Sequence, residues 1–70
     1  DIFYVKIESD AKLVSYHLIS VEGKIVLEKE FRNVNADSPI SVYVSDLASG
    51  MYILKITIDD EVSSQRLIRN

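Results

Sequence analysis

One short motif, Leu47 to Tyr52 with the pattern Leu-x-x-Gly-x-Tyr, constrains the fold of this chain more than any other feature. The pattern is typical of a corner in a β-sandwich, where Leu47 fills the core, Gly50 takes a backbone conformation costly for other residues, and Tyr52 begins a strand. In such a corner the phenol donates a hydrogen bond to backbone a few residues upstream, here near Ala48. Such a corner stabilises the fold and takes no part in binding or catalysis by itself. It therefore predicts a sandwich and leaves the function open.

Apolar and polar residues alternate along most of the chain, and no stretch keeps the spacing of a helix. We therefore expect six short strands, separated by turn signals at about ten-residue spacing, in an antiparallel Greek-key-like sandwich. The expected strands are 2–8, 12–20, 24–31, 40–45, 51–58 and 62–69. A small open barrel is the alternative, because alternation alone does not distinguish closure from two packed sheets.

The phase of the alternation predicts which side chains face the core. The predicted inward side chains are Phe3, Val5, Ile7, Val14, Tyr16, Leu18, Ile25, Leu27, Phe31, Ile40, Val42, Val44, Tyr52, Leu54, Ile56 and Ile58. Between the strands we expect a turn at 9–11, a hairpin closed by Gly23 with positive φ and followed by Lys24, and an acidic tip at 59–61. The polar interval 32–39 is predicted to be a loop that crosses between sheets.

Length and composition set further limits. Seventy residues make one small domain, 1–70, which buries roughly 60% of its unfolded surface and leaves no room for a second domain. The chain begins at Asp1 without an initiating Met or a targeting segment, so we interpret it as a fragment or processed product. It has no apolar run near the ~20 residues of a membrane span. Without Cys it has no disulfide and no Cys-based zinc site.

The charges are dispersed over the chain, with eight Lys or Arg against eleven Asp or Glu and a net charge of −3. A nucleic-acid binder normally has a basic stripe with stacking aromatic residues, and a dispersed acidic balance releases few counterions. The composition therefore indicates an ordinary soluble surface and no nucleic-acid partner.

The sequence offers few candidate catalytic or metal-binding residues. His17, the only histidine, falls on an outward phase beside Ser15, where a solvated or hydrogen-bonded side chain is expected rather than a base or metal ligand. Asp59, Asp60 and Glu61 could attract calcium, but a calcium site needs six to eight oxygens, so a solvated tip is the default. Both glycines, Gly23 and Gly50, are isolated, so no phosphate loop is present. We expect no catalysis, no metal and no cofactor.

Two tyrosines, Tyr4 and Tyr43, fall on the outward phase. Exposed tyrosines can stack on sugar rings, as in a carbohydrate-binding module, but cross-strand packing explains them equally well.

The end of the chain, Arg66-Leu67-Ile68-Arg69-Asn70, alternates charge with apolar bulk up to the last residues, where most chains fray. An edge strand protected by cations explains this pattern. The alternative is that a partner reads the segment.

In their joint order, these motifs resemble the type A C-terminal sorting domain of proteins exported by the type IX (Por) secretion system. The resemblance spans nearly the whole chain: a strand into a Gly-Lys turn at Gly23 and Lys24, an extended strand, the corner from Leu47 to Tyr52, and a last strand with basic residues at Arg66 and Arg69. The Pro-Asn-Pro-like run that usually precedes the first strand is absent, which indicates a trimmed N-terminal edge. The family's final basic pair is often Lys-Lys, and Arg keeps the charge with a different donor geometry.

The resemblance implies an all-β fold, a small antiparallel immunoglobulin-like β-sandwich of six to seven strands. It implies a non-catalytic address that directs an N-terminal cargo protein through the periplasm and the outer-membrane translocon to the cell surface or medium. A sortase usually removes such a domain. It also implies that the translocon recognises the final segment, Arg66, Leu67, Ile68, Arg69 and Asn70, while Gly23, Lys24, Leu47, Gly50 and Tyr52 are structural.

Two other function classes stay open at this point. The chain could be an immunoglobulin-like module that binds carbohydrate or protein for an adjoining enzyme, or a purely structural spacer or adhesin domain. A weak homodimer through sheet edges is also expected, because a small sandwich has unpaired end strands and the last strand lacks a protective proline.

Overall fold

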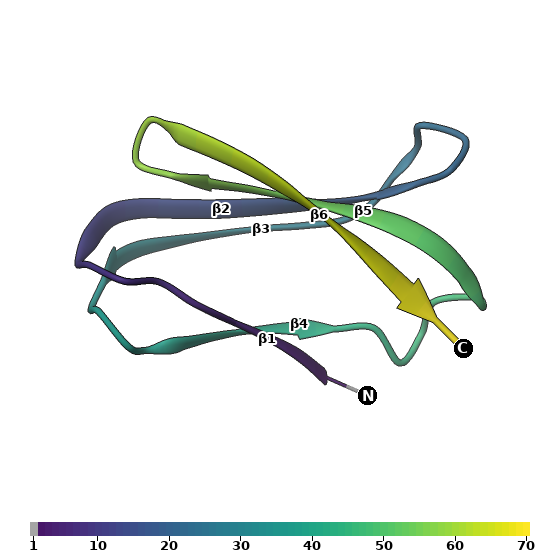
Figure 1. Cartoon of the computed structure of the whole chain (residues 1–70), viewed down its shortest axis with the longest axis horizontal. Coiled ribbons are helices and arrows are strands. Elements are labelled where there is room, and N and C mark those ends of the chain that lie inside the picture. Colours follow the sequence, from purple (N-terminus) through teal and green to yellow (C-terminus); the bar gives the residue numbers. More distant parts are fainter. Residues whose placement is uncertain (1) are drawn as a thin grey trace.

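The computed structural model describes residues 2–70 and contains two antiparallel sheets (Figure 1). The strands are β1 (Ile2–Lys6), β2 (Ala11–Ser20), β3 (Ile25–Val34), β4 (Pro39–Tyr43), β5 (Gly50–Ile58) and β6 (Glu61–Arg69). One sheet has the order β3-β2-β5-β6, and the other pairs β1 with β4. The predicted six-stranded, immunoglobulin-like sandwich is confirmed, and the open-barrel alternative is not what the described strands form.

The core lies between the inward faces of the two sheets. Val14, Leu18 and Leu54 have no exposed surface in the four-stranded sheet, and Val42 has none in the two-stranded sheet. The predicted inward phases of β1, β2, β4 and β5 are confirmed, with Phe3, Val5 and Ile58 only partly buried. Because each strand places alternate side chains on one face, these four strands bring a continuous apolar layer together.

Tyr16 links the two sheets across this core. Its ring packs near that of Phe31, with 6.2 Å between ring centroids, and its hydroxyl donates to the Ser41 carbonyl of β4 at 3.4 Å. Burial raises the pKa of the Tyr16 phenol above its ordinary value, and the nearby Tyr43 phenol adds to the rise. The hydroxyl therefore stays a hydrogen-bond donor at physiological pH.

The corner has the predicted geometry. The Tyr52 hydroxyl donates to the Ala48 carbonyl at 2.6 Å, and Gly50 has a positive φ of 150°. Leu47 packs partly buried against the core, and its amide donates to the Val44 carbonyl at 3.1 Å. The corner thus returns the chain from the two-stranded sheet to the centre of the four-stranded one.

The β2–β3 hairpin closes as predicted, through Gly23 with a φ of 86°. The Ser20 amide donates to the Lys24 carbonyl at 2.8 Å, and the Gly23 amide donates to the Ser20 carbonyl at 2.9 Å. The positive φ predicted for Gly23 is confirmed, and Lys24 takes part in the turn through its backbone carbonyl.

One predicted phase is wrong. The alternation places Ile25 on the buried face with Leu27, but Ile25 is 52% exposed and its neighbour Val26 packs against the core. The pairing shifts between Leu18, which faces Leu27, and Ile19, which faces Ile25. This bulge leaves one extra residue on β3, and one extra residue moves the following side chain to the opposite face.

The predicted limits of the connection before β4 are also wrong. β3 continues to Val34, which pairs with Ala11, so the loop spans only 35–38 and Ala11 is a buried strand residue rather than part of a turn. The amide of Ala36 donates to the Asp10 carboxylate at 2.7 Å. The polar composition of the interval is explained by the exposed face of β3, and the predicted crossing between sheets is confirmed.

The corner hydrogen bond leads to the first testable prediction. Replacing Tyr52 with Phe should lower the free energy of unfolding by about 1 kcal/mol, because one part-buried hydrogen bond is lost while the ring stays. The matched control is Tyr4→Phe, whose hydroxyl lies on a ring that is mostly exposed. Equal denaturation midpoints for the two variants would contradict the assignment.

Candidate recognition surface on the last strand

The sequence-predicted recognition segment forms the end of β6, the edge strand of the four-stranded sheet. Its residues pair in register with the start of β5: Arg66 with Ile53, Leu67 with Tyr52, Ile68 with Met51, and Arg69 with Gly50. The segment is therefore ordered strand and lies directly beside the tyrosine corner. Its other edge has no partner strand among the described residues.

The alternation of β6 divides the segment between two faces. Leu67 points inward opposite Tyr52 and is only 6% exposed, whereas Arg66 and Ile68 lie on the outer face and are exposed. Residues near a chain end usually have few core contacts. Leu67 is an exception, because it is a member of the buried core cluster. Burial of a Leu side chain stabilises a fold by roughly 1.5–3 kcal/mol, so Leu67 anchors the segment.

Arg69 ties the end of β6 to the turn between β4 and β5. Its Nη2 donates to the Ser45 carbonyl at 3.2 Å, and the side chain is partly buried. The sequence gives no signal for this contact, because Ser45 and Arg69 are 24 residues apart. Arg69 therefore differs from Arg66, which projects from the outer face.

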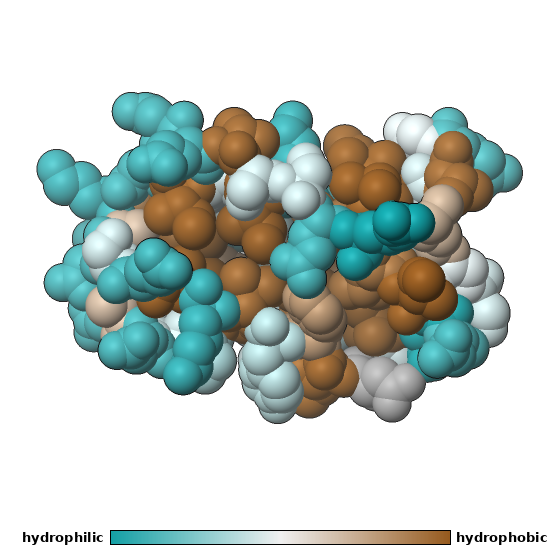
Figure 2. Space-filling model, viewed as in Figure 1, coloured by the Kyte–Doolittle hydropathy of each residue, from teal (hydrophilic) through white to brown (hydrophobic). Residues whose placement is uncertain are grey.

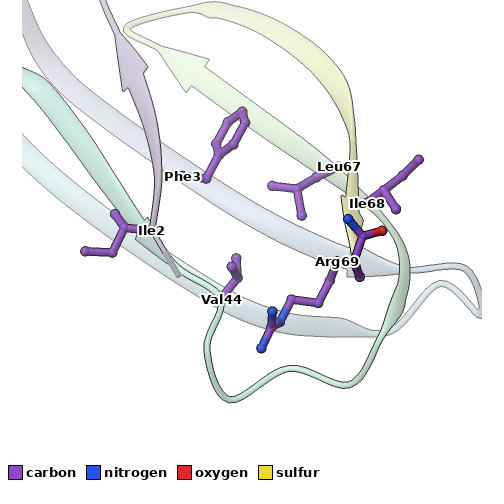
Figure 3. A pocket seen from close by; sticks show the side chains of 7 residues that line it. Ile2, Phe3, Val44, Leu67, Ile68 and Arg69 are labelled. Carbon is purple, nitrogen blue, oxygen red and sulfur yellow. The ribbon is translucent and has the colours of Figure 1, made fainter.

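A shallow hollow lies between β1 and the end of β6 (Figure 3). Its volume is about 230 Å³, and it is lined by Ile2, Phe3, Val44, Leu67, Ile68, Arg69 and Asn70. Pockets for small molecules usually have volumes of ~300–1,000 Å³ and several convergent polar groups. This hollow is smaller, and its lining combines four aliphatic side chains with Phe3, Arg69 and Asn70 at the open seam between the two sheets.

The only histidine has the predicted outward position. His17 Nε2 lies 3.2 Å from Glu28 Oε2 on the neighbouring strand. This contact is an ion pair when the imidazole is protonated. This cross-strand contact satisfies the histidine on an open sheet surface.

The acidic tip is exposed as predicted, and Asp59 also bonds to a neighbouring strand, which the sequence does not predict. Its carboxylate oxygen Oδ1 accepts hydrogen bonds from the amides of Lys12 at 3.0 Å and Leu13 at 3.1 Å. Its own amide donates to the Leu13 carbonyl at 2.8 Å. Asp59 thus fastens the β5–β6 turn to the start of β2. Within residues 2–70, no group of three or more His, Asp or Glu side chains is arranged to hold a metal ion.

Tyr4 and Tyr43 lie on the outer face of the two-stranded sheet, as predicted. Tyr4 pairs with Ser41 and Tyr43 pairs with Ile2, so the tyrosines are diagonal neighbours. Both are about 60% exposed. Diagonal pairs of long side chains are within reach of each other, so cross-strand packing accounts for their position.

Comparison with known protein families decides between the remaining function classes. Over residues 1–70, the sequence matches the family described as secretion system C-terminal sorting domain. The chain belongs to this family. No curated protein and no solved structure matches it.

The sorting domain is a C-terminal secretion signal of the type IX system, and it directs export to the cell surface or the extracellular space. Domains of this family are in general non-catalytic, and the binding-module reading is not favoured. None of the described residues forms a helix able to span a membrane. The resemblance inferred from the Gly-Lys turn, the corner and the basic end is thus confirmed.

The role of Asp59 generates a second prediction. Asp59→Ala should lower the free energy of unfolding by about 1–3 kcal/mol, because two backbone amides lose their acceptor. Asp60→Ala is the control, since the adjacent exposed carboxylate has no such bond among the described contacts. Thermal melts with and without calcium measure both effects. A melting temperature that rises with calcium in the wild type but not in Asp59→Ala would restore the metal reading.

Proposed function

We propose that the type IX translocon recognises the last strand of the folded sorting domain, with Arg66 and Ile68 as the contacting side chains. Leu67 seats the strand in the core, Arg69 fastens its end to the β4–β5 turn, and Asn70 completes the segment. The observation that supports this assignment is the split of adjacent residues between the two faces: Leu67 is buried, while Arg66 and Ile68 are exposed.

The cargo and this segment meet at one end of the sandwich. The family places the domain C-terminal to its cargo, so the cargo is joined on the side of β1. The start of β1 and the end of β6 lie at the same end of the sandwich (Figure 1), and Ile2 and Asn70 line the same hollow. We propose that a sortase removes the domain after export by cutting on the cargo side of β1, so the cut leaves the sandwich intact.

Export of a fused reporter tests the recognition residues in a host that has this system. The variant Arg66→Glu with Ile68→Ser should leave the reporter in the periplasm, because it reverses the outward charge and removes the outward apolar contact. Arg69→Lys should be exported, since a Lys ammonium can also donate to the Ser45 carbonyl. Reporter on the cells and in the medium is compared with reporter trapped in the periplasm.

The matched control is Ser64→Glu, which adds a carboxylate on the same outer face of the same strand, two residues upstream of Arg66. It should be exported normally. All three variants change exposed or clasping positions rather than Leu67, so their melting curves should stay close to that of the wild type. Normal export of the Arg66 and Ile68 variant would refute the assignment.

We also propose weak self-association through the free edge of β6. Residues 62–66 of this strand are exposed and contain no proline, whereas β4 begins with Pro39. Solution scattering over a concentration series should show a rising apparent mass, and Val62→Lys should reduce the rise because edge lysines oppose strand addition. A strictly monomeric wild-type profile at high concentration would exclude this association.

A further inference from the structure

The outer face of the four-stranded sheet is divided into an apolar half and a polar half. Cross-strand pairing sets Ile25 beside Ile19, Ile19 beside Ile53, and Ile53 beside Arg66, while Met51 lies beside Ile68. We call these six residues the apolar half. At the spacing of neighbouring strands, the row from Ile25 to Arg66 spans about 14 Å.

The other half of this face is polar apart from Leu13 and Val62. Its side chains come from the same four strands, further from the corner: Glu28 and Glu30, Ser15 and His17, Lys55 and Thr57, and Ser64. The sheet therefore does not carry apolar side chains over its whole outer surface. They are concentrated at the end that holds the recognition segment.

Five of the six residues of the apolar half are exposed, and Ile19 is half-buried. Ile68 is 65% exposed, Met51 41% and Ile53 37%, and Ile25 is exposed to a similar degree. Hydrophobic side chains reach the surface at this end of the molecule, near the β2–β3 hairpin and the C-terminus (Figure 2). Apolar residues scattered singly over a surface are normal, but a contiguous exposed group of this kind marks an interaction site.

The bulge in β3 supplies a second, independent observation. In a regular ladder, with Val26 opposite Ile19, Ile25 would keep the phase of Leu27 and face the core. The bulge instead places Ile25 outward, opposite Ile19, and so completes the apolar row. Bulges commonly re-aim a side chain next to a functional site, and this one extends the apolar half to the far edge of the sheet.

The charge of the apolar half indicates what its partner presents. Arg66 is the only ionised side chain among the six, and none of the described ion pairs involves it. A guanidinium covered by an apolar surface needs a carboxylate on the covering partner, because an unpaired buried charge is costly. A second copy stacked on the same half would oppose apolar residues to one another, with carboxylates available only outside it.

We propose that the apolar half is a docking surface for a component of the type IX machinery that presents an apolar patch with one carboxylate opposite Arg66. This inference rests on the proposed function and deepens it: the machinery reads a face of the folded domain rather than the last residues as a linear peptide. Ile19, Ile25 and Ile53 are distant from the C-terminus in sequence, and only the folded sheet places them beside Arg66 and Ile68.

Reporter export again measures the effect, now with changes outside the last strand. The variants are Ile25→Thr, Ile53→Thr and the double variant, because Thr keeps the β-branched shape that strands favour and removes apolar surface. The matched controls are Val62→Thr, an exposed apolar residue in the polar half, and Tyr4→Thr on the opposite sheet. The double variant should export about tenfold less reporter, as expected when docking loses a few apolar contacts. Both controls should export normally.

Two further measurements separate this inference from its alternatives. A reporter ending in residues 61–70 alone should stay in the periplasm, since the isolated strand lacks the rest of the apolar half. Purified wild-type domain and double variant should show the same mass in sedimentation and similar melting curves.

Three results would overturn the inference. The first is normal export of the double variant, and the second is efficient export of the 61–70 reporter. The third is a wild-type dimer that the double variant converts to monomer, which would assign the surface to a second copy. The earlier Arg66 and Ile68 variant tests the last strand by itself, so it can succeed while this inference fails.

Discussion

The packing of β2 against β5 is the constraint on which the rest of this small sandwich depends. These two strands are the centre of the four-stranded sheet, and their inward residues Val14, Leu18 and Leu54 are fully buried. Each has a neighbour strand on both sides, so the two supply the continuous floor on which β1 and β4 rest. A 70-residue domain has a thin stability margin, so the polar contacts at its periphery matter.

Those peripheral contacts hold the turns to the central strands. Tyr52 bonds to the corner at Ala48, Asp59 bonds to the first amides of β2, and Arg69 bonds to Ser45 in the turn after β4. In each case a side chain supplies the partner for a backbone group that a strand ladder leaves unpaired. The edges of the sheets remain open, and the order of the chain end comes from these clasps rather than from a further strand.

The sequence predicted the parts of the fold that depend on local rules. Alternation identifies the inward faces of β2 and β5, because a side-chain period of two is a property of any strand. Gly23, Gly50 and Tyr52 are identified by their backbone and hydrogen-bonding requirements. The bulge at Val26 was not predictable, because both Ile25 and Val26 are apolar and either can face the core.

The candidate site was predicted only as a stretch of sequence. The basic and apolar alternation of Arg66 to Arg69 gives the segment, and the register with β5 decides which side chains are available. The contacts of Asp59 and Arg69 join residues that are far apart in sequence, so no local pattern reports them. The apolar half escapes prediction for the same reason: its six residues come from four strands, and adjacency across a sheet depends on register.

Burial of Leu67 couples the outward display of Arg66 and Ile68 to folding. Arg66 and Ile68 lie on the outer face because the residue between them is seated opposite Tyr52, inside the core that β2 and β5 build. In an unfolded chain the same residues rotate independently, and neither the outward pair nor the row from Ile25 to Arg66 exists. A partner that binds this face therefore binds the folded domain in preference to the unfolded one, and its binding free energy adds to the stability of the sandwich. On the proposed recognition of this face, the signal is a property of the fold, and the small stability margin of the domain would help the machinery to discriminate folded from unfolded cargo ends.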